Sequence, residues 1–147
     1  MHVRVQEEPF DLGTEVDQFI RIQDNVGAVV TFSGVVRDTP AQDLDAMEIE
    51  HYPAMAQAAL EDIATQALNR WSLADVIIIH RFGRLTLREA IMMVGTAAPH
   101  RQDAFAAAAF LMDYLKSRAP FWKKELRGGR WEWVSSRTED AEALARW

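Results

Sequence analysis

Cysteine is absent from this chain, and lysine occurs only three times in 147 residues. Without cysteine the chain can form neither disulfides nor zinc–thiolate sites, and nothing in it requires an oxidising compartment. Apolar runs such as VIIIH are far too short to cross a membrane, and no basic N-terminal segment precedes an apolar run. We therefore expect a cytoplasmic protein without a signal peptide or a membrane span.

The length and the composition predict one domain, 1–147, with an ordinary globular mixture of residues. A net charge of −6 argues against general nucleic-acid binding. The charge is unevenly distributed, because residues 114–130 hold six cations and a single glutamate while the rest of the chain is strongly acidic. A cationic spot on an acidic body suits a small anionic ligand or an acidic partner.

The order of strand-like and helix-like segments predicts an α+β fold, because they are interspersed without a regular βαβ period. Apolar alternation and β-branched runs predict strands at 1–5, 28–36, 46–52, 76–83 and 91–97. Helical spacing predicts helices at 14–24, 53–70 and 102–117. A hairpin about Gly128-Gly129 and a short last helix, capped by Ser136 with Glu139, complete the prediction.

All three lysines, Lys116, Lys123 and Lys124, lie within nine residues in YLKSRAPFWKKE. Arginine stays charged in proteins, whereas a lysine changes its pKa when it is desolvated or placed near other cations. The aromatic residues of this stretch can provide the desolvation, and such a lysine can serve as an acid, a base or a nucleophile. The alternative is a solvated basic face after a helix C-terminus, where cations are mildly favoured. Composition alone leaves both open.

A second candidate is APHRQDAF, 98–105, in which His100 and Arg101 stand at the start of a predicted helix. Free N–H groups and the helix dipole suit a phosphate at such a place, although an ordinary surface pair is an equally good interpretation. Arg37, at the end of a predicted strand, is likewise either a ligand for an anion or an ordinary charge at a strand end. His80, within an apolar strand, is predicted to be a hydrogen-bonded core residue. We find no metal-ligand spacing, glycine-rich phosphate loop or nucleophile elbow.

Five segments of the chain together resemble a known family. They are SGVVRD, EIEHYPAMA, IIHRFGRL, APHRQDAF and FLMDYLKSRAPFWKKE. In order and spacing they are similar to the large, catalytic subunit of molybdopterin synthase, over roughly residues 5–147. One departure is the loop DTPAQDLD, where many members of that family have an asparagine and a glycine.

The resemblance implies an α/β-hammerhead fold with mixed sheets and packed helices, and a homodimeric core within a heterotetramer. The other partner is a small ubiquitin-like sulfur carrier that ends in Gly-Gly and is activated as a thiocarboxylate. The implied reaction adds two sulfurs to cyclic pyranopterin monophosphate and gives molybdopterin, without a metal or a permanently bound cofactor. Because the sulfur arrives on the carrier, the absence of cysteine from this chain is then understandable.

By position, the resemblance implies catalytic roles for Lys116, near the carrier's C-terminus, and for Lys123, which acts on the pterin. It also implies a set of substrate-binding residues: Val35, Val36, Arg37, His100, Arg101, Lys124 and Glu125. Arg101 and Lys116 open and close one predicted helix, so they are roughly 22 Å apart. We therefore expect a composite pocket, with Arg37, Lys116 and Lys123 from one subunit and His100 and Arg101 from its dimer mate.

Three other functions are compatible with parts of the sequence. The basic and aromatic segment 114–130 could bind a nucleotide, a phosphate or single-stranded RNA as a non-catalytic interaction module. A lysine enzyme that forms a Schiff base could use the same cluster. A non-catalytic relative could keep only the fold. The net charge counts against the first of these, and the presence of all the matched site residues counts against the last.

Overall fold

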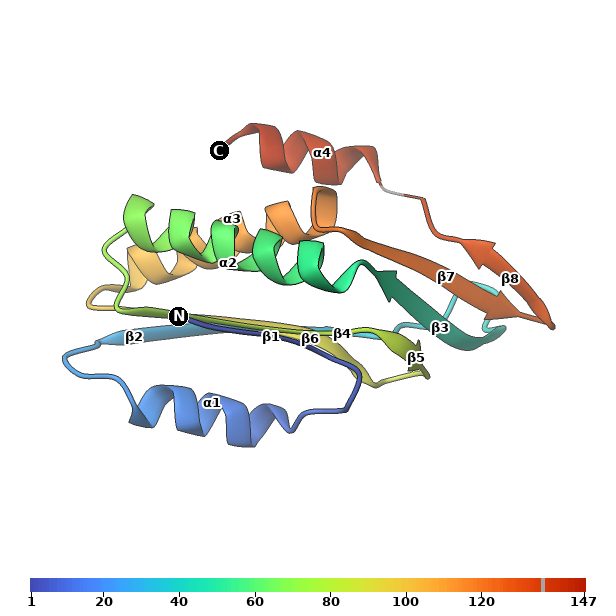
Figure 1. Cartoon of the computed structure of the whole chain (residues 1–147), viewed down its shortest axis with the longest axis horizontal. Coiled ribbons are helices and arrows are strands. Elements are labelled where there is room, and N and C mark those ends of the chain that lie inside the picture. Colours follow the sequence, from blue (N-terminus) through green and yellow to red (C-terminus); the bar gives the residue numbers. More distant parts are fainter. Residues whose placement is uncertain (136) are drawn as a thin grey trace.

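Two four-stranded sheets organise the residues described by the computed structural model, which are 1–135 and 137–147 (Figure 1). The first sheet has the order β1-β4-β6-β2, from β1 (His2–Gln6), β4 (Asp75–Arg81), β6 (Ala90–Ala98) and β2 (Ala28–Val35). Strand β1 is parallel to β4, and the other neighbours are antiparallel. The second sheet is antiparallel throughout, with β5 (Gly83–Leu85), β3 (Leu44–His51), β7 (Phe121–Arg127) and β8 (Arg130–Trp133) in that order.

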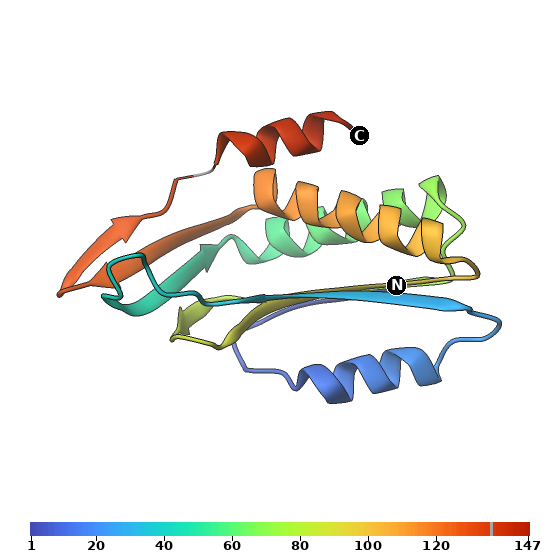
Figure 2. The ribbon, with the colours of Figure 1, turned by 180° about the vertical axis from the view of Figure 1, so that it is seen from behind.

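Helices cover both faces of the first sheet, as Figures 1 and 2 show. Helix α1 (Leu12–Arg21) lies on one face, whereas α2 (Pro53–Arg70) and α3 (Arg101–Ser117) lie side by side on the other. Helix α4 (Thr138–Ala145) packs on α3. The predicted α+β class is confirmed. In the part of the chain that the structure describes, no helix combines the length and the apolar character needed to span a bilayer.

The two central strands are apolar throughout because both of their faces are covered. Nearly every residue of β4 and β6 is buried. On one face Phe19 of α1 packs with Ile77, Ile79 and Met93. On the other face α2 buries the stripe predicted from its spacing, Ala56, Leu60, Ile63 and Ala67.

Most predicted elements agree with the structure, and the helix prediction 53–70 agrees to the residue. The predicted strand 76–83 is wrong as a single strand, because β4 ends at Arg81 and β5 begins at Gly83 in the other sheet. Gly83 has φ +86°, a conformation that favours glycine and lets the chain change sheets. The last helix begins at Thr138, and its predicted cap, Ser136, lies outside the described residues.

The connection from α3 into β7 decides where the lysines lie. Helix α3 ends at Ser117, before the Ala119-Pro120 pair, as expected from the restriction that proline places on its predecessor. After three connecting residues the chain enters β7, the third strand of the second sheet. The other half of α3 is fixed to β6, because the buried Thr96 hydroxyl donates a 2.7 Å hydrogen bond to the Ala104 carbonyl. The C-terminal turn of α3 therefore meets the start of β7 where the two sheets adjoin.

Candidate active site

Lys116, in the last turn of α3, and Lys123, on β7, share a wall between two cavities. The larger cavity has a volume of about 450 Å³ and the smaller one about 70 Å³. Four residues line both of them: His80, Leu115, Lys116 and Lys123. Two of the three lysines are thus brought together, at a place reached from two sides.

The rest of the larger cavity comes from the C-terminal third of the chain and from Met55 of α2. The α3–β7 connection forms one side, and the segment between β8 and α4 forms another. Arg118 and Arg137 add two cations to its wall, and Asp140 of α4 adds one carboxylate. This cavity is therefore suited to a ligand with a negative charge.

The rest of the smaller cavity comes from the first sheet and from α3. Its walls are formed by Phe32, Gly34 and Val35 of β2, Ile91 and Met92 of β6, and Met112 of α3. Strand β2 is an edge of its sheet, and Val35 is 53% exposed. The smaller cavity is therefore mostly apolar and lies beside an unpaired strand edge.

Burial lowers the pKa of Lys123 from its ordinary value of 10.5 to about 8. The positive charge of Lys116 contributes to this lowering of the pKa after burial, and the carboxylate of Asp140 acts in the opposite direction. Both causes proposed from the sequence, desolvation and a neighbouring cation, are therefore present at Lys123. This excludes the solvated basic face as a description of Lys123, and it places an amine near the pH at which proton transfer is efficient.

We expect Lys123 to titrate near pH 8, well below an ordinary lysine. With only three lysines, a chain labelled with ¹³C at lysine Cε gives three side-chain signals, each followed from pH 6 to 11 by NMR. The Lys116→Ala variant removes a like charge, so the pKa of Lys123 should rise towards 10.5.

The matched control is Lys124→Ala, which removes an equal charge from the neighbouring position of β7. Lys124 does not contribute to the shift at Lys123, so the Lys123 signal should keep its midpoint. A Lys123 signal that titrates with an ordinary midpoint in the wild-type chain would contradict the prediction.

An aromatic stack supports the floor of the site. The centroid of the Phe121 ring lies 3.8 Å from that of the His80 ring, and the two rings are nearly parallel. The ring of His51, which is paired with Phe121 across the β3–β7 ladder, lies 6.1 Å away. His51 in turn stacks on Phe82 at 4.1 Å. Phe121 is thus engaged with histidines from β4 and β3, and it is not free to stack on a nucleobase.

The structure does not bring Lys124 and Glu125 to the two cavities. Neighbouring residues of a strand point to opposite faces. The Lys124 ammonium accordingly forms a 3.0 Å ion pair with Glu50 and lies over the rings of Trp131 and Trp133, at 5.2 and 5.4 Å. Glu125 shares the face of Lys123 but is half-buried farther along β7. Their roles in substrate binding remain predictions from the sequence.

Val35, the last residue of β2, and the two residues that follow it lie in different surroundings. Val35 lines the smaller cavity, whereas Val36 is buried in the core. The backbone N–H of Val36 donates to Glu89 and its carbonyl accepts from Arg88, at 3.0 and 2.9 Å, so its polar groups are already paired. Arg37 is exposed just beyond the strand, at the same end of the sheet. Arg37 lines neither of the two cavities, so its role in substrate binding stays a prediction from the sequence.

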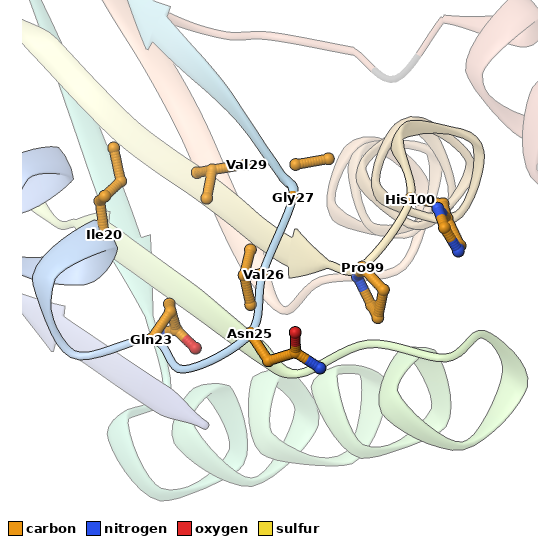
Figure 3. A pocket seen from close by; sticks show the side chains of 9 residues that line it. Ile20, Gln23, Asn25, Val26, Gly27, Val29, Pro99 and His100 are labelled. Atoms are coloured by element: carbon orange, nitrogen blue, oxygen red, sulfur yellow. The ribbon is translucent and has the colours of Figure 1, made fainter.

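His100 and Arg101 lie at the opposite end of α3 from Lys116. His100 precedes the helix, and Arg101 is its first residue. His100 lines a third, open cavity of about 830 Å³, together with Pro99 and residues 25–29 (Figure 3). In that view Ile20 and His100 lie on opposite sides of the segment that carries Gly27. No lysine lines this cavity. Within one chain the predicted site residues therefore form two groups, one at each end of α3.

A buried lysine with a lowered pKa, on a cavity wall rich in cations, is the arrangement of an α+β enzyme subunit suited to an anionic substrate. The family model described as MoaE protein matches residues 5–118, and the chain belongs to this family. It is 56% identical over its whole length, and over the whole of that relative, to the molybdopterin synthase catalytic subunit of Cereibacter sphaeroides.

Solved structures agree with this assignment. The molybdopterin biosynthesis MoaE protein from Burkholderia ambifaria is 48% identical and has a TM-score of 0.84, with 100% of this chain and 98% of that chain covered. A complex of subunits 1 and 2 of the molybdopterin-converting factor from Helicobacter pylori has a TM-score of 0.80 at 17% identity, over 92% of this chain and 91% of that one. The latter likeness concerns the fold alone. The fold expected from the resemblance is confirmed.

Sequence reasoning missed part of the site. His80 was assigned to the core, and it is buried, but it also lines both cavities beside the two lysines. The signal is a histidine directly after the apolar run VIII. Arg118 and Arg137 were not singled out either, although Arg118 lies in the segment that carries the resemblance.

Proposed function

We propose that this chain is the catalytic subunit of a molybdopterin synthase, acting as one 147-residue domain. It transfers sulfur from the thiocarboxylated C-terminus of a small carrier subunit to cyclic pyranopterin monophosphate, and the product is molybdopterin. Each thiocarboxylate carries one sulfur atom, so two carrier molecules are used for each pterin. The membership of the chain in the MoaE protein family supports this function.

The observation that carries the proposal is the position of Lys123. Its amine is buried beside a second cation, on a wall reached from two cavities, and its pKa is lowered to about 8. Two reactants can then meet the same pair of lysines from different sides. At the carrier's end, Lys116 stabilises the thiocarboxylate or moves a proton. At the pterin, Lys123 stabilises charge or moves a proton.

The larger cavity is the place for the carrier's tail. A Gly-Gly tail is slender and extended, and its thiocarboxylate is an anion. The cations of Lys116, Arg118 and Arg137 complement that charge. The exposed side chains of Trp122 and Val134, which line the same cavity, offer apolar surface to the body of the carrier. Subunits 1 and 2 of the Helicobacter pylori factor form a complex, which is consistent with such a partner.

The smaller cavity is one half of the pterin site, and a second copy of this chain supplies the other half. Its volume of about 70 Å³ is too small for a pterin, since ligand pockets usually measure about 300–1,000 Å³. It lies beside β2, an unpaired edge that exposes Phe32 and Val35. Two such edges related by a two-fold axis can pair, which removes both of them from water.

Pairing of β2 with its own copy also explains how distant residues meet. Strand β2 runs beside α3, from the end near His100 to the end near Lys116 (Figure 2). Seven steps of about 3.3 Å give β2 a length of roughly 23 Å, close to the length of the helix. When two copies of β2 pair antiparallel, the N-terminal end of one strand lies beside the C-terminal end of the other. His100 and Arg101 of one subunit then reach the Arg37, Lys116 and Lys123 of its mate.

The proposal is tested by single-turnover conversion of cyclic pyranopterin monophosphate. The purified chain is mixed with a thiocarboxylated small subunit, and molybdopterin is measured as its fluorescent oxidation product. We expect product with the charged carrier and none with the same carrier ending in a carboxylate. No product, from a carrier whose thiocarboxylate is verified by mass spectrometry, would refute the proposed function.

The alternative of a non-catalytic phosphate or nucleotide module has less support. Phe121 is held in the histidine stack and Lys123 is buried, so neither is presented to an extended nucleic acid. Retention on a nucleic-acid column at moderate salt would favour the module. For the synthase we further propose a cytoplasmic location and no resident cofactor, with cyclic pyranopterin monophosphate bound only as substrate.

A further inference from the structure

One carboxylate faces four cations in the larger cavity, among the residues that the structure describes. The cations are Lys116, Arg118, Lys123 and Arg137, and the carboxylate is that of Asp140, in the first turn of α4. No ion pair within the described ranges, 1–135 and 137–147, includes Asp140. Its negative charge is therefore not committed to a single partner and acts on the cavity as a whole.

Helix α3 holds Asp140 at this place. The hydroxyl of Ser117, the last residue of α3, donates a 2.6 Å hydrogen bond to the backbone carbonyl of Asp140. Beyond the other end of α4, the Arg146 guanidinium and the Trp147 indole N–H both donate to the carboxylate of Asp113, at 2.8 and 2.5 Å. Helix α4 is thus attached to α3 on both sides, and Asp140 is a fixed part of the cavity wall.

The charge of Asp140 reaches the lysines of the site. Burial and the positive charge of Lys116 lower the pKa of Lys123, whereas the carboxylate of Asp140 raises it. The remaining titratable group on this wall is His80, which stays neutral because burial lowers its pKa to about 3. Asp140 is therefore the charge that partly offsets the cations of the cavity. An anion that enters the same cavity is attracted by the cations and repelled by Asp140.

We propose that Asp140 is a built-in counter-charge of the larger cavity, which competes with the anionic end of the carrier's tail for the same cations. The carrier then binds less tightly than four cations alone would allow. Such weakening is useful in a reaction that uses two carriers for each pterin, because a spent carrier has to leave before the next one enters. The inference rests on the proposed function for the identity of the anion, but its electrostatics can be tested on the chain alone.

The first test is the titration of Lys123 without any carrier. Asp140→Asn removes the charge and nearly preserves the shape, so the Lys123 midpoint, followed through its ¹³Cε signal, should fall below 8. The matched control is Glu142→Gln, which removes an equal charge from an exposed position of α4 that lines neither cavity. It should leave the midpoint unchanged. A wild-type midpoint in Asp140→Asn would overturn the proposal.

The second test is the affinity for a carrier that ends in a carboxylate, measured by titration calorimetry at low salt. We expect Asp140→Asn to bind it roughly two- to tenfold more tightly than wild type, as for the loss of one like charge at a partly exposed site. The gain should shrink at high salt, which screens such charges. A carrier that ends in a neutral amide should bind wild type and Asp140→Asn equally, and Glu142→Gln should behave as wild type with both carriers.

A purely structural role for Asp140 predicts a change of the opposite sign. An acidic residue in the first turn stabilises a helix through its dipole, so a structural Asp140→Asn would loosen α4 and weaken carrier binding. Weaker or unchanged affinity would therefore overturn the counter-charge, as would an equal gain for the amide-ended carrier. If hydrogen exchange shows that α4 detaches in Asp140→Asn, the same measurements on Asp140→Gln decide, because glutamine suits this position of a helix.

Failure of the synthase function and failure of the counter-charge give different results. If wild type makes no molybdopterin but Asp140→Asn tightens binding of the carboxylate-ended carrier alone, the synthase function fails and the counter-charge stands. If wild type makes molybdopterin but Asp140→Asn changes neither the Lys123 midpoint nor the affinity, the function stands and the counter-charge fails. When both hold, spent carrier should inhibit steady-state turnover of Asp140→Asn more strongly than that of wild type, by the factor found for its affinity.

Discussion

Replacing Lys123 with alanine is expected to lower single-turnover formation of molybdopterin by at least about 100-fold, as is usual when a group that moves a proton is removed. Lys116→Ala should have a loss of similar size, because its ammonium lines the cavity proposed for the carrier's tail and also lowers the pKa of Lys123. The measurement is the fluorescent oxidation product, followed over time with the charged carrier in excess. Both variants are compared with wild type at the same pH.

Loss of activity in these variants should occur without loss of fold. A lysine in the last turn of a helix contributes little to stability, so Lys116→Ala should change the free energy of unfolding by less than about 0.5 kcal/mol. Lys123→Ala removes a group whose charge is disfavoured by burial, so it should not destabilise the chain. Urea denaturation checks both values. An unfolded Lys116→Ala chain would mean that the lysine is structural.

Lys124→Ala is the matched control in the same strand. Its ammonium is paired with Glu50 between two tryptophans, away from both cavities. We therefore expect a much smaller loss of rate than for the other two lysines. If Lys124 also binds substrate, as the sequence predicts, its replacement will raise KM and leave the maximal rate unchanged. Equal losses for all three lysines would contradict the assignment of the site to the shared wall.

The second large effect is expected from mixed dimers. Arg101→Ala and Lys116→Ala chains should each be inactive alone, because every composite site lacks either its Arg101 or its Lys116. In a hetero-dimer one site combines the intact Lys116 of one chain with the intact Arg101 of the other. Random mixing in equal amounts restores about one quarter of the wild-type sites, as expected for an isologous dimer. The measurement is the single-turnover amplitude after the two chains are unfolded and refolded together.

The control mixes Lys116→Ala with Lys123→Ala. Both residues come from the same side of the composite site, so a mixed dimer regains no complete site and should stay inactive. Recovery in the first mixture and not in the second would locate Arg101 across the dimer from the lysines. Absence of recovery in both, with exchange of subunits verified by mass spectrometry, would refute the composite pocket.

The helices and most strands were predictable from the sequence because their periodicities are local properties. Helix α2 begins with a proline and buries an evenly spaced stripe, so both its limits and its inner face could be derived. The strand predicted over 76–83 failed for a non-local reason. The change of sheet at Gly83 depends on the pairing of β5 with β3, more than thirty residues earlier, and no local pattern reports that pairing.

The site was predictable in its lysines and less so in its surroundings. The cluster in YLKSRAPFWKKE is visible without a structure, and the chemistry of lysine gives it meaning. The separation of Lys124 from Lys123 follows from strand alternation once β7 is known, but the strand had been predicted without assigning its faces. The place of His80 depends on the meeting of the two sheets, because β4 and β7 belong to different sheets and are joined there by the stack of His80 on Phe121.

The wall between the two cavities has a consequence for the order of events. Residues that line only the larger cavity belong to α2, the last residue of α3, the α3–β7 connection, β7 and the segment around α4. Those that line only the smaller one are Met112 of α3 and residues of β2 and β6. In the proposed arrangement a spent carrier withdraws on one side while the pterin stays on the other. The half-converted pterin can then wait in place for a fresh carrier, and a reactive intermediate with one sulfur is never released into water.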